Sequence, residues 1–126
     1  VSFAIHADTT VLEMPLPMQI LSLEMPVTIE KSKSMLYADL ELLHFPLLLR
    51  KWQPGDWFIP FGMKGRKKLS DYFTDRKMSL YDKEEVWLLL SGDEVVWIVG
   101  ERPDDRFRVT NQTKRVLHIH LEQGKR

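Results

Sequence analysis

The sequence predicts an α+β domain in which short strands dominate. Three observations lead to this prediction: strand-like segments recur along the whole chain, two short segments carry helical signals, and prolines interrupt the chain at intervals. The chain has 126 residues, of which 44% are apolar. We therefore expect residues 1–126 to form a single domain with its own hydrophobic core.

Nine segments either alternate apolar and polar residues or form a short apolar run, as strands do. They span residues 2–7, 18–25, 27–30, 35–38, 47–52, 86–90, 95–99, 106–109 and 116–121. Residues 86–90 are apolar throughout, so we expect this strand to be buried on both faces. The polar residues 91–94 predict a turn to the next strand.

Helical signals are short. Residues 39–43 predict one helical turn with Asp39 as its cap. Residues 69–77 predict an amphipathic helix that begins near Ser70 as cap and has a narrow apolar stripe. Residues 82–85 resemble a capping box, which predicts another helical turn beginning at Asp82.

The composition excludes several classes of site. The chain has no cysteine, which removes disulfides, thiolate zinc sites and cysteine nucleophiles. His118 and His120 alternate on one face of the last predicted strand, but a metal site needs a third ligand. We expect them to be exposed, and we predict neither a metal site nor catalytic residues.

Sequence signals for membranes and nucleotides are also lacking. No stretch has the apolar length of a membrane span, and the first residues do not resemble a signal peptide. We therefore expect a cytoplasmic protein with no membrane partner. The sequence contains no P-loop and no GxGxxG pattern.

Charge is concentrated in the middle of the chain. Residues 50–78 carry a net charge of +5, against −4 for residues 1–49 and −1 for residues 79–126. Such segregation favours a surface for a polyanion, although a solvated loop is the alternative. The predicted contact residues are the cations of the glycine-flanked loop and those beside it. They are Lys64, Arg66, Lys67, Lys68, Arg50, Lys51, Arg76 and Lys77.

The loop cations crowd the predicted start of the helix at residue 69. The first turn of a helix favours acidic residues, so helix stability gives no reason for the cations, whereas a bound phosphate does. Four aromatic residues lie close by: Trp52, Trp57, Phe58 and Phe61. Such side chains can stack on bases, but we expect most of these to belong to the core.

Three motifs give the second half of the chain a family resemblance. R-x-x-x-P-G-D-x-F begins at Arg50, G-M-K-G-x-K-K-L-S-D-x-F at Gly62, and I-V-G-x-R-x-D-x-R-F at Ile98. Together they resemble the C-terminal domain of tRNA(Ile)-lysidine synthetases over residues 49–121. The resemblance implies an SH3-like β-sandwich or mixed sheet with two short helices, similar to a domain of the phenylalanyl-tRNA synthetase β subunit. Residues 1–48 would supply flanking strands.

The resemblance also implies a function. The family's full enzyme is an ATP-dependent ligase that joins lysine to the wobble cytidine of tRNA(Ile). This domain would bind the tRNA acceptor stem and contact the N-terminal catalytic domain of the same chain. The family's S-G-G-x-D-S phosphate loop is absent from these residues. We therefore expect no cofactor here, with ATP and lysine used by the N-terminal domain, and no catalysis by this fragment alone.

Two alternatives stay open for the residues. Lys64, Lys67 and Lys68 match the family's basic block, while Arg66 falls at a variable position. Arg50, Arg102 and Arg106 also match, but each can instead brace a turn by pairing with Asp56, Asp104 or Asp105. The rival function is an SH3-like module that binds a protein, including a second copy of the chain as a homodimer, and does not contact RNA.

Overall fold

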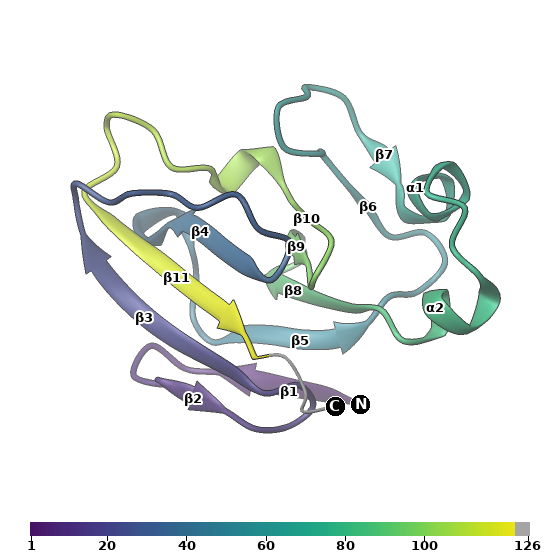
Figure 1. The fold of residues 1–126 in the computed structure, drawn as a ribbon, viewed down its shortest axis with the longest axis horizontal. Helices are drawn as coiled ribbons and strands as arrows, with labels where there is room; N and C mark the ends of the chain where they lie inside the picture. Colours follow the sequence, from purple (N-terminus) through teal and green to yellow (C-terminus); the bar gives the residue numbers. More distant parts are fainter. Residues whose placement is uncertain (123–126) are drawn as a thin grey trace.

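The computed structural model describes residues 1–122 and has two antiparallel sheets facing each other (Figure 1). The larger sheet has five strands in the order β1-β5-β8-β9-β10. Its strands are β1 (Ser2–Ile5), β5 (Leu47–Lys51), β8 (Trp87–Ser91), β9 (Glu94–Ile98) and β10 (Arg102–Pro103). The predicted hairpin in residues 86–99 is therefore confirmed as β8 and β9.

The smaller sheet brings the last strand of the chain together with three strands from its first 39 residues. Its four strands are β2 (Val11–Leu12), β3 (Met18–Glu24), β11 (Arg115–Leu121) and β4 (Met35–Asp39), in that order. Ile119 of β11 lies opposite Ile20 on one side and Leu36 on the other. This three-residue row is buried and points into the sandwich.

Apolar side chains from both sheets form the main core. Leu47 and Leu49 of β5 alternate inward, and both are fully buried. They belong to one cluster with Met18, Leu36 and Ile119 of the other sheet. Inward-facing apolar residues at alternate positions of the strands therefore close the sandwich.

A second core covers the outer face of the five-stranded sheet. There α1 (Leu69–Asp75) and β6 (Trp57–Phe58) pack on β8 and β9. Leu88 points to this helix side, whereas its neighbour Leu89 points into the sandwich, and neither is exposed. The prediction that this strand is buried on both faces is thus confirmed.

α1 is shorter than the predicted helix over residues 69–77. It ends because Lys77 takes a left-handed conformation with φ 56°. The Met78 N–H donates to Phe73 O (3.1 Å) and the Lys77 N–H donates to Thr74 O (3.0 Å), which is a Schellman ending. Ser70 is not the cap, since that position is taken by Lys68, whose side chain makes no capping hydrogen bond.

Of the two other predicted helical segments, one is capped as expected and the other begins earlier than expected. The 3₁₀ turn η1 (Leu40–Leu42) is capped by Asp39, which accepts from the Glu41 N–H at 3.1 Å, as predicted. α2 (Leu80–Glu84) begins before Asp82, so that predicted start was wrong. The Ser79 hydroxyl accepts from the Asp82 N–H at 3.0 Å and caps the helix from the position before it begins.

Two predicted strands are not formed. Residues 27–30 belong to the connection from β3 to β4, two strands that lie on either side of β11. Residues 106–109 were expected to be a strand, but the 3₁₀ turn η2 (Asp105–Phe107) occupies this region. Asp104 caps that turn by accepting from the Arg106 N–H at 2.8 Å. Within residues 1–122, no helix has the length and apolar character of a membrane span.

Candidate nucleic-acid interface

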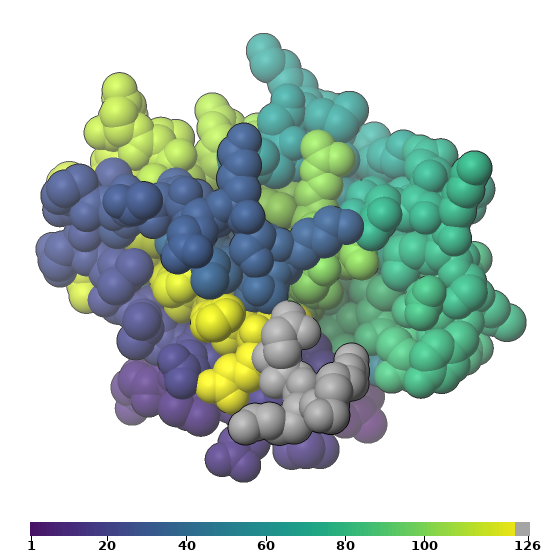
Figure 2. Space-filling model, in the orientation of Figure 1, coloured from purple at the N-terminus to yellow at the C-terminus, as the bar shows by residue number. Residues whose placement is uncertain are grey.

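The basic segment forms a separate ribbon at the edge of the molecule. β6 and β7 (Lys67–Lys68) pair antiparallel, with Trp57 opposite Lys68 and Phe58 opposite Lys67. The connection between them, residues 59–66, projects from the top of the molecule in both views (Figure 1, Figure 2). We call residues 59–61 the loop base and residues 62–66 the loop tip.

The loop base is fastened to the segment that carries β10. The Phe61 N–H donates to Pro103 O (3.0 Å), and the Arg102 Nη2 donates to Phe61 O (2.7 Å). The Asp105 N–H donates to Ile59 O (2.7 Å). Two backbone hydrogen bonds and one from the Arg102 side chain therefore position the loop without using the side chains of the tip.

Asp104 is the centre of this fastening and is almost completely buried, at 1% exposure. Its carboxylate accepts from the Ile59 N–H (2.8 Å) and from Nε and Nη2 of Arg106 (3.0 and 2.9 Å). The hydrogen bond to Asp104 raises the pKa of Arg106 above its ordinary value. Arg106 also donates to Glu94 at 3.0 Å, so carboxylates of the protein itself neutralise its charge.

Trp57 connects this buried pair to the exposed surface. The guanidinium carbon of Arg106 lies 4.8 Å from the centroid of the Trp57 ring, and that of Arg66 lies 4.0 Å from it. Such cation–π contacts hold a guanidinium through the aromatic ring without neutralising it. Arg66 is thus held against the Trp57 ring while its charge can still bind an anion.

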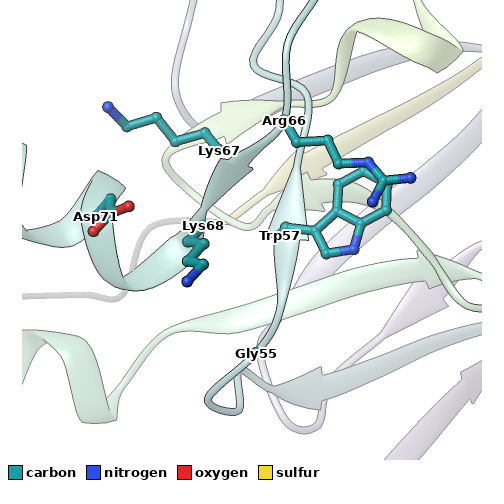
Figure 3. Close-up of a pocket in the computed structure, with 6 residues that line it drawn as sticks. All are labelled: Gly55, Trp57, Arg66, Lys67, Lys68 and Asp71. Atoms are coloured by element: carbon teal, nitrogen blue, oxygen red, sulfur yellow. The ribbon is translucent and has the colours of Figure 1, made fainter.

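A hollow opens beside Trp57, and we call it the Trp57 pocket (Figure 3). Its volume is about 540 Å³. The residues that line it are Gly55, Trp57, Arg66, Lys67, Lys68 and Asp71. In Figure 3 the side chains of Lys67 and Lys68 leave β7 in different directions, and Arg66 lies on the Trp57 ring.

A smaller hollow of about 170 Å³ lies between the loop and α1. Lys67 lines both hollows, so they are adjacent. In the smaller one, Lys67 is paired with Asp75 of α1. Arg76 reaches the same hollow and binds Glu101 at 3.0 Å, and its hydrogen bond to Glu101 raises the pKa of Arg76.

The eight predicted contact residues fall into two groups. Four are held by acceptors of the protein itself: Arg50 by Asp56, Lys51 by Glu84 O and Glu85, Lys67 by Asp75, and Arg76 by Glu101. For the other four, no carboxylate of residues 1–122 lies within ion-pair distance. These are Lys64, Arg66, Lys68 and Lys77.

The structure brings some of these cations together and separates others. Arg66, Lys67 and Lys68 line one pocket, and Lys64 is exposed in the adjoining loop tip. Lys77 lies beyond the end of α1 and lines a different hollow. The loop tip and β7 carry Lys64, Arg66, Lys67 and Lys68, and α1 begins only after Lys68, at the predicted residue 69.

The turn-bracing alternative applies to two of the three arginines. Arg50 donates two hydrogen bonds to Asp56, both 2.9 Å, and the hydrogen bond raises the pKa of Arg50. Arg106 binds Asp104 as described above. Arg102 makes no such pair within the described chain and donates to the backbone instead.

The aromatic residues of this segment do not share one environment. Phe58 is fully buried, and Trp52 packs against Phe73 with ring centroids 4.9 Å apart, as expected for core residues. Phe61 is 48% exposed and is an exception to the expectation that most of these residues belong to the core. Trp57 is half-buried at the rim of its pocket, a position that local sequence did not distinguish from the core.

The histidines of β11 also differ from expectation. His118 is half-buried and stacks on Tyr37 with ring centroids 4.3 Å apart, and one of its ring nitrogens lies 3.0 Å from Leu36 O. Its exposure was therefore predicted wrongly, because β4 places an aromatic ring beside it. Across residues 1–122 there is no group of three side chains suited to hold a metal ion.

Comparison with known proteins places this chain within a described family. Residues 47–121 match the family described as TilS substrate C-terminal domain. The tRNA(Ile)-lysidine synthase of Parabacteroides distasonis is 55% identical over 110 residues, which is 87% of this chain and 25% of that protein. The tRNA(Ile)-lysidine synthase of Bacteroides thetaiotaomicron is 46% identical over 109 residues, or 83% of this chain and 26% of that protein. The chain thus spans about a quarter of the length of these relatives.

Solved structures share the fold. A crystal structure of the TilS C-terminal domain superimposes with a TM-score of 0.79 at 16% identity and covers 95% of both chains. An N-terminal fragment of the phenylalanyl-tRNA synthetase β subunit from Pyrococcus horikoshii has a TM-score of 0.58 at 20% identity, covering 68% of this chain and 27% of that one. The expected sheet-rich fold with two short helices, common to these two kinds of protein, is confirmed.

Proposed function

Because this chain belongs to the TilS substrate C-terminal domain family, we propose that it recognises tRNA on behalf of a tRNA(Ile)-lysidine synthase. The observation that carries the proposal is the group of unpaired cations on the β6–β7 ribbon. Lys64, Arg66 and Lys68 are exposed, and no carboxylate of the described chain neutralises them. Exposed cations without partners are what a phosphate backbone requires.

The proposed contact is with the acceptor stem of tRNA(Ile). Proteins recognise duplex RNA largely by its shape, through phosphates and 2′-hydroxyls, so stacking aromatics are not needed. This fits the ribbon, where Trp57 is covered by Arg66 and is not an open stacking surface. The cations would then position the stem and leave the reaction to another part of the enzyme.

Lys67 contributes to the same surface despite its pairing with Asp75. Asp75 is 63% exposed in that pair, and exposed ion pairs contribute only about 0–1 kcal/mol. A phosphate can therefore displace the carboxylate at little cost. Arg50 and Arg106 differ, since each donates at least two hydrogen bonds to a well-covered carboxylate, and we assign them structural roles.

The proposal divides the work of the full-length enzyme. ATP and lysine would bind to a catalytic domain elsewhere in the same polypeptide, which this domain contacts, and ligation of lysine to the wobble cytidine would occur there. This domain alone would bind tRNA without modifying it. The enzyme would act in the cytoplasm.

A gel-shift series with this chain tests the proposal. The ligands are tRNA(Ile), its acceptor-stem hairpin and its anticodon hairpin. We expect the first two to bind with similar affinity and the anticodon hairpin to bind more weakly. The triple variant Lys64→Ala, Arg66→Ala, Lys68→Ala is expected to lose about 10- to 100-fold in affinity.

The control variant removes the same charge elsewhere. Lys31, Lys33 and Lys114 are exposed cations of loops in the four-stranded sheet, and replacing them with alanine also removes three charges. This variant is expected to bind almost as the unmodified chain does. Equal losses in the two triple variants would show that only net charge matters and would contradict the assigned surface.

Self-association is a second candidate function. Leu80 and Tyr81 of α2 are 71% and 72% exposed, and a second copy of the chain could cover them in a homodimer. This candidate predicts an association that rises with protein concentration and does not weaken with salt. Sedimentation of the chain, and of the variant Leu80→Ser, Tyr81→Ser, at low and high salt separates it from RNA binding.

A further inference from the structure

Asp71 is an acidic residue within a basic site. It is the single carboxylate among the residues that line the Trp57 pocket, which also contains Arg66, Lys67 and Lys68. Asp71 is exposed, and no cation of residues 1–122 lies within ion-pair distance of it. A negative charge in such a place repels phosphate, so its presence in a phosphate-binding surface needs a reason.

Few groups on a nucleic acid bind a carboxylate favourably. A carboxylate only accepts hydrogen bonds, and the donors of a nucleic acid are base amino and imino groups and the ribose 2′-hydroxyl. In a duplex the bases are paired, whereas a 2′-hydroxyl lies beside every phosphate of RNA and is displayed in the shallow minor groove. A ribose hydroxyl is thus the donor most available to Asp71.

The arrangement of the pocket fits this donor. Figure 3 shows Lys68 between Asp71 on one side and Trp57 with Arg66 on the other. A strand whose phosphates are held by Arg66 and Lys68 carries its sugars along the same line. The ribose next to the phosphate on Lys68 would then lie beside the Asp71 carboxylate.

We propose that Asp71 accepts a hydrogen bond from a ribose 2′-hydroxyl and thereby makes this surface select RNA over nucleic acids that lack the hydroxyl. The inference rests on the proposed function, since it assumes that the ribbon binds an RNA backbone. It adds a specificity-determining residue that attracts no phosphate. Asp71 also lies in the first turn of α1, where an acidic residue stabilises the helix, and that role alone predicts no preference for RNA.

The test compares two acceptor-stem hairpins, one of RNA and one with 2′-fluoro sugars. The 2′-fluoro hairpin keeps the same sequence, charge and A-form shape and lacks the hydroxyl donor. We expect the unmodified chain to bind the RNA hairpin roughly 10-fold more tightly, which is the effect of one hydrogen bond to a charged acceptor. Asp71→Ala is expected to bring this ratio close to 1, partly because the 2′-fluoro hairpin is no longer repelled.

Two further variants separate this role from helix stability. Asp71→Asn retains an acceptor oxygen and is expected to keep part of the preference. Asp75→Ala removes the other α1 carboxylate near the pocket, the one paired with Lys67, and should leave the ratio near 10. An unchanged ratio in Asp71→Ala, or no preference in the unmodified chain, overturns the inference while RNA binding itself stands. Failure of the chain to bind either hairpin overturns both the inference and the proposed function.

Discussion

Beside the base of the loop that joins β6 to β7, Arg106 donates two hydrogen bonds to the buried Asp104, whereas at the loop tip Lys64 and Arg66 face no carboxylate of the described chain. The two places meet at Trp57, whose ring contacts a guanidinium from each. The Asp104–Arg106 pair uses its charges to hold the loop base, and the loop tip keeps its charges exposed.

The difference indicates that one part of this small surface contributes to stability and the other to binding. A buried carboxylate must be satisfied, so Asp104 and Arg106 depend on each other and on the Ile59 N–H. Exposed cations contribute little to folding and can be replaced without affecting it. Variants of the Asp104–Arg106 pair should therefore change the free energy of unfolding, and variants of the loop tip should change only binding.

The largest effect is expected at Asp104. Asp104→Ala leaves the Arg106 guanidinium without its buried partner and the Ile59 N–H without its acceptor. We expect the free energy of unfolding to fall by about 3–5 kcal/mol, measured by urea denaturation. Asp93→Ala, in the exposed turn between β8 and β9, is the control and should change it by less than about 0.5 kcal/mol. A loss of unfolding free energy in Asp104→Ala no greater than in Asp93→Ala would contradict the difference between the Asp104–Arg106 pair and the loop tip.

Trp57 should show an intermediate effect because its ring contacts both Arg106 and Arg66. Trp57→Ala removes a half-buried ring and the contacts of two guanidiniums. We expect a loss of about 2 kcal/mol in stability together with weaker RNA binding. Arg66→Ala should weaken binding with almost no loss of stability. If Trp57→Ala alters stability alone, Arg66 does not depend on the ring for its position.

A smaller effect of opposite sign is expected at Lys77. Its φ of 56° suits glycine, so Lys77→Gly should stabilise the chain by about 1 kcal/mol in the same urea titration. This cation serves the end of α1, where a positive charge is favourable, and lies in a hollow apart from the Trp57 pocket. A clear loss of RNA affinity in Lys77→Gly would extend the binding surface beyond the tip.

The smallest effect concerns Tyr72, which lies under the loop and donates to Glu101 at 3.1 Å. Burial, and then the charge of Glu101, raise the pKa of Tyr72 above its ordinary value. The folded chain therefore holds this proton more tightly, so the stabilisation is complete below about pH 10 and is lost as the pH rises through the raised pKa. Tyr72→Phe should make the unfolding free energy less sensitive to alkaline pH, whereas an unchanged alkaline slope would show that Tyr72 does not cause it.

Periodicity was sufficient to predict much of the fold. The strands near residues 18–25 and 116–121 could be predicted because apolar and polar residues alternate along them. The strand at residues 86–90 could be predicted because it is buried on both faces, so that all its residues are apolar. Two-residue strands such as β7 and β10 could not be found, since pairing alone defines them. The end of α1 was missed because lysine replaces the glycine that usually marks a left-handed cap.

The candidate site was predictable in composition but not in pairing. The motif at residues 62–68 places four cations together, and Asp56 lies six positions after Arg50, a spacing that a turn can bridge. The pairs Arg76–Glu101 and Lys67–Asp75 depend on how α1 packs, so sequence alone could not tell occupied cations from available ones. Trp57 and Phe58 are adjacent and equally aromatic, and only the strand pairing sends one to the pocket rim and the other to the core.

The central claim is that Lys64 and Arg66 of the loop tip and Lys68 of β7 are kept for RNA phosphates, and the salt dependence of tRNA binding tests it most directly. The slope of log K against log salt should fall by roughly 2–3 in Lys64→Ala, Arg66→Ala, Lys68→Ala, with the unfolding free energy unchanged. The triple variant of Lys31, Lys33 and Lys114 should keep the slope of the unmodified chain. A slope that is the same for all three proteins would contradict the claim.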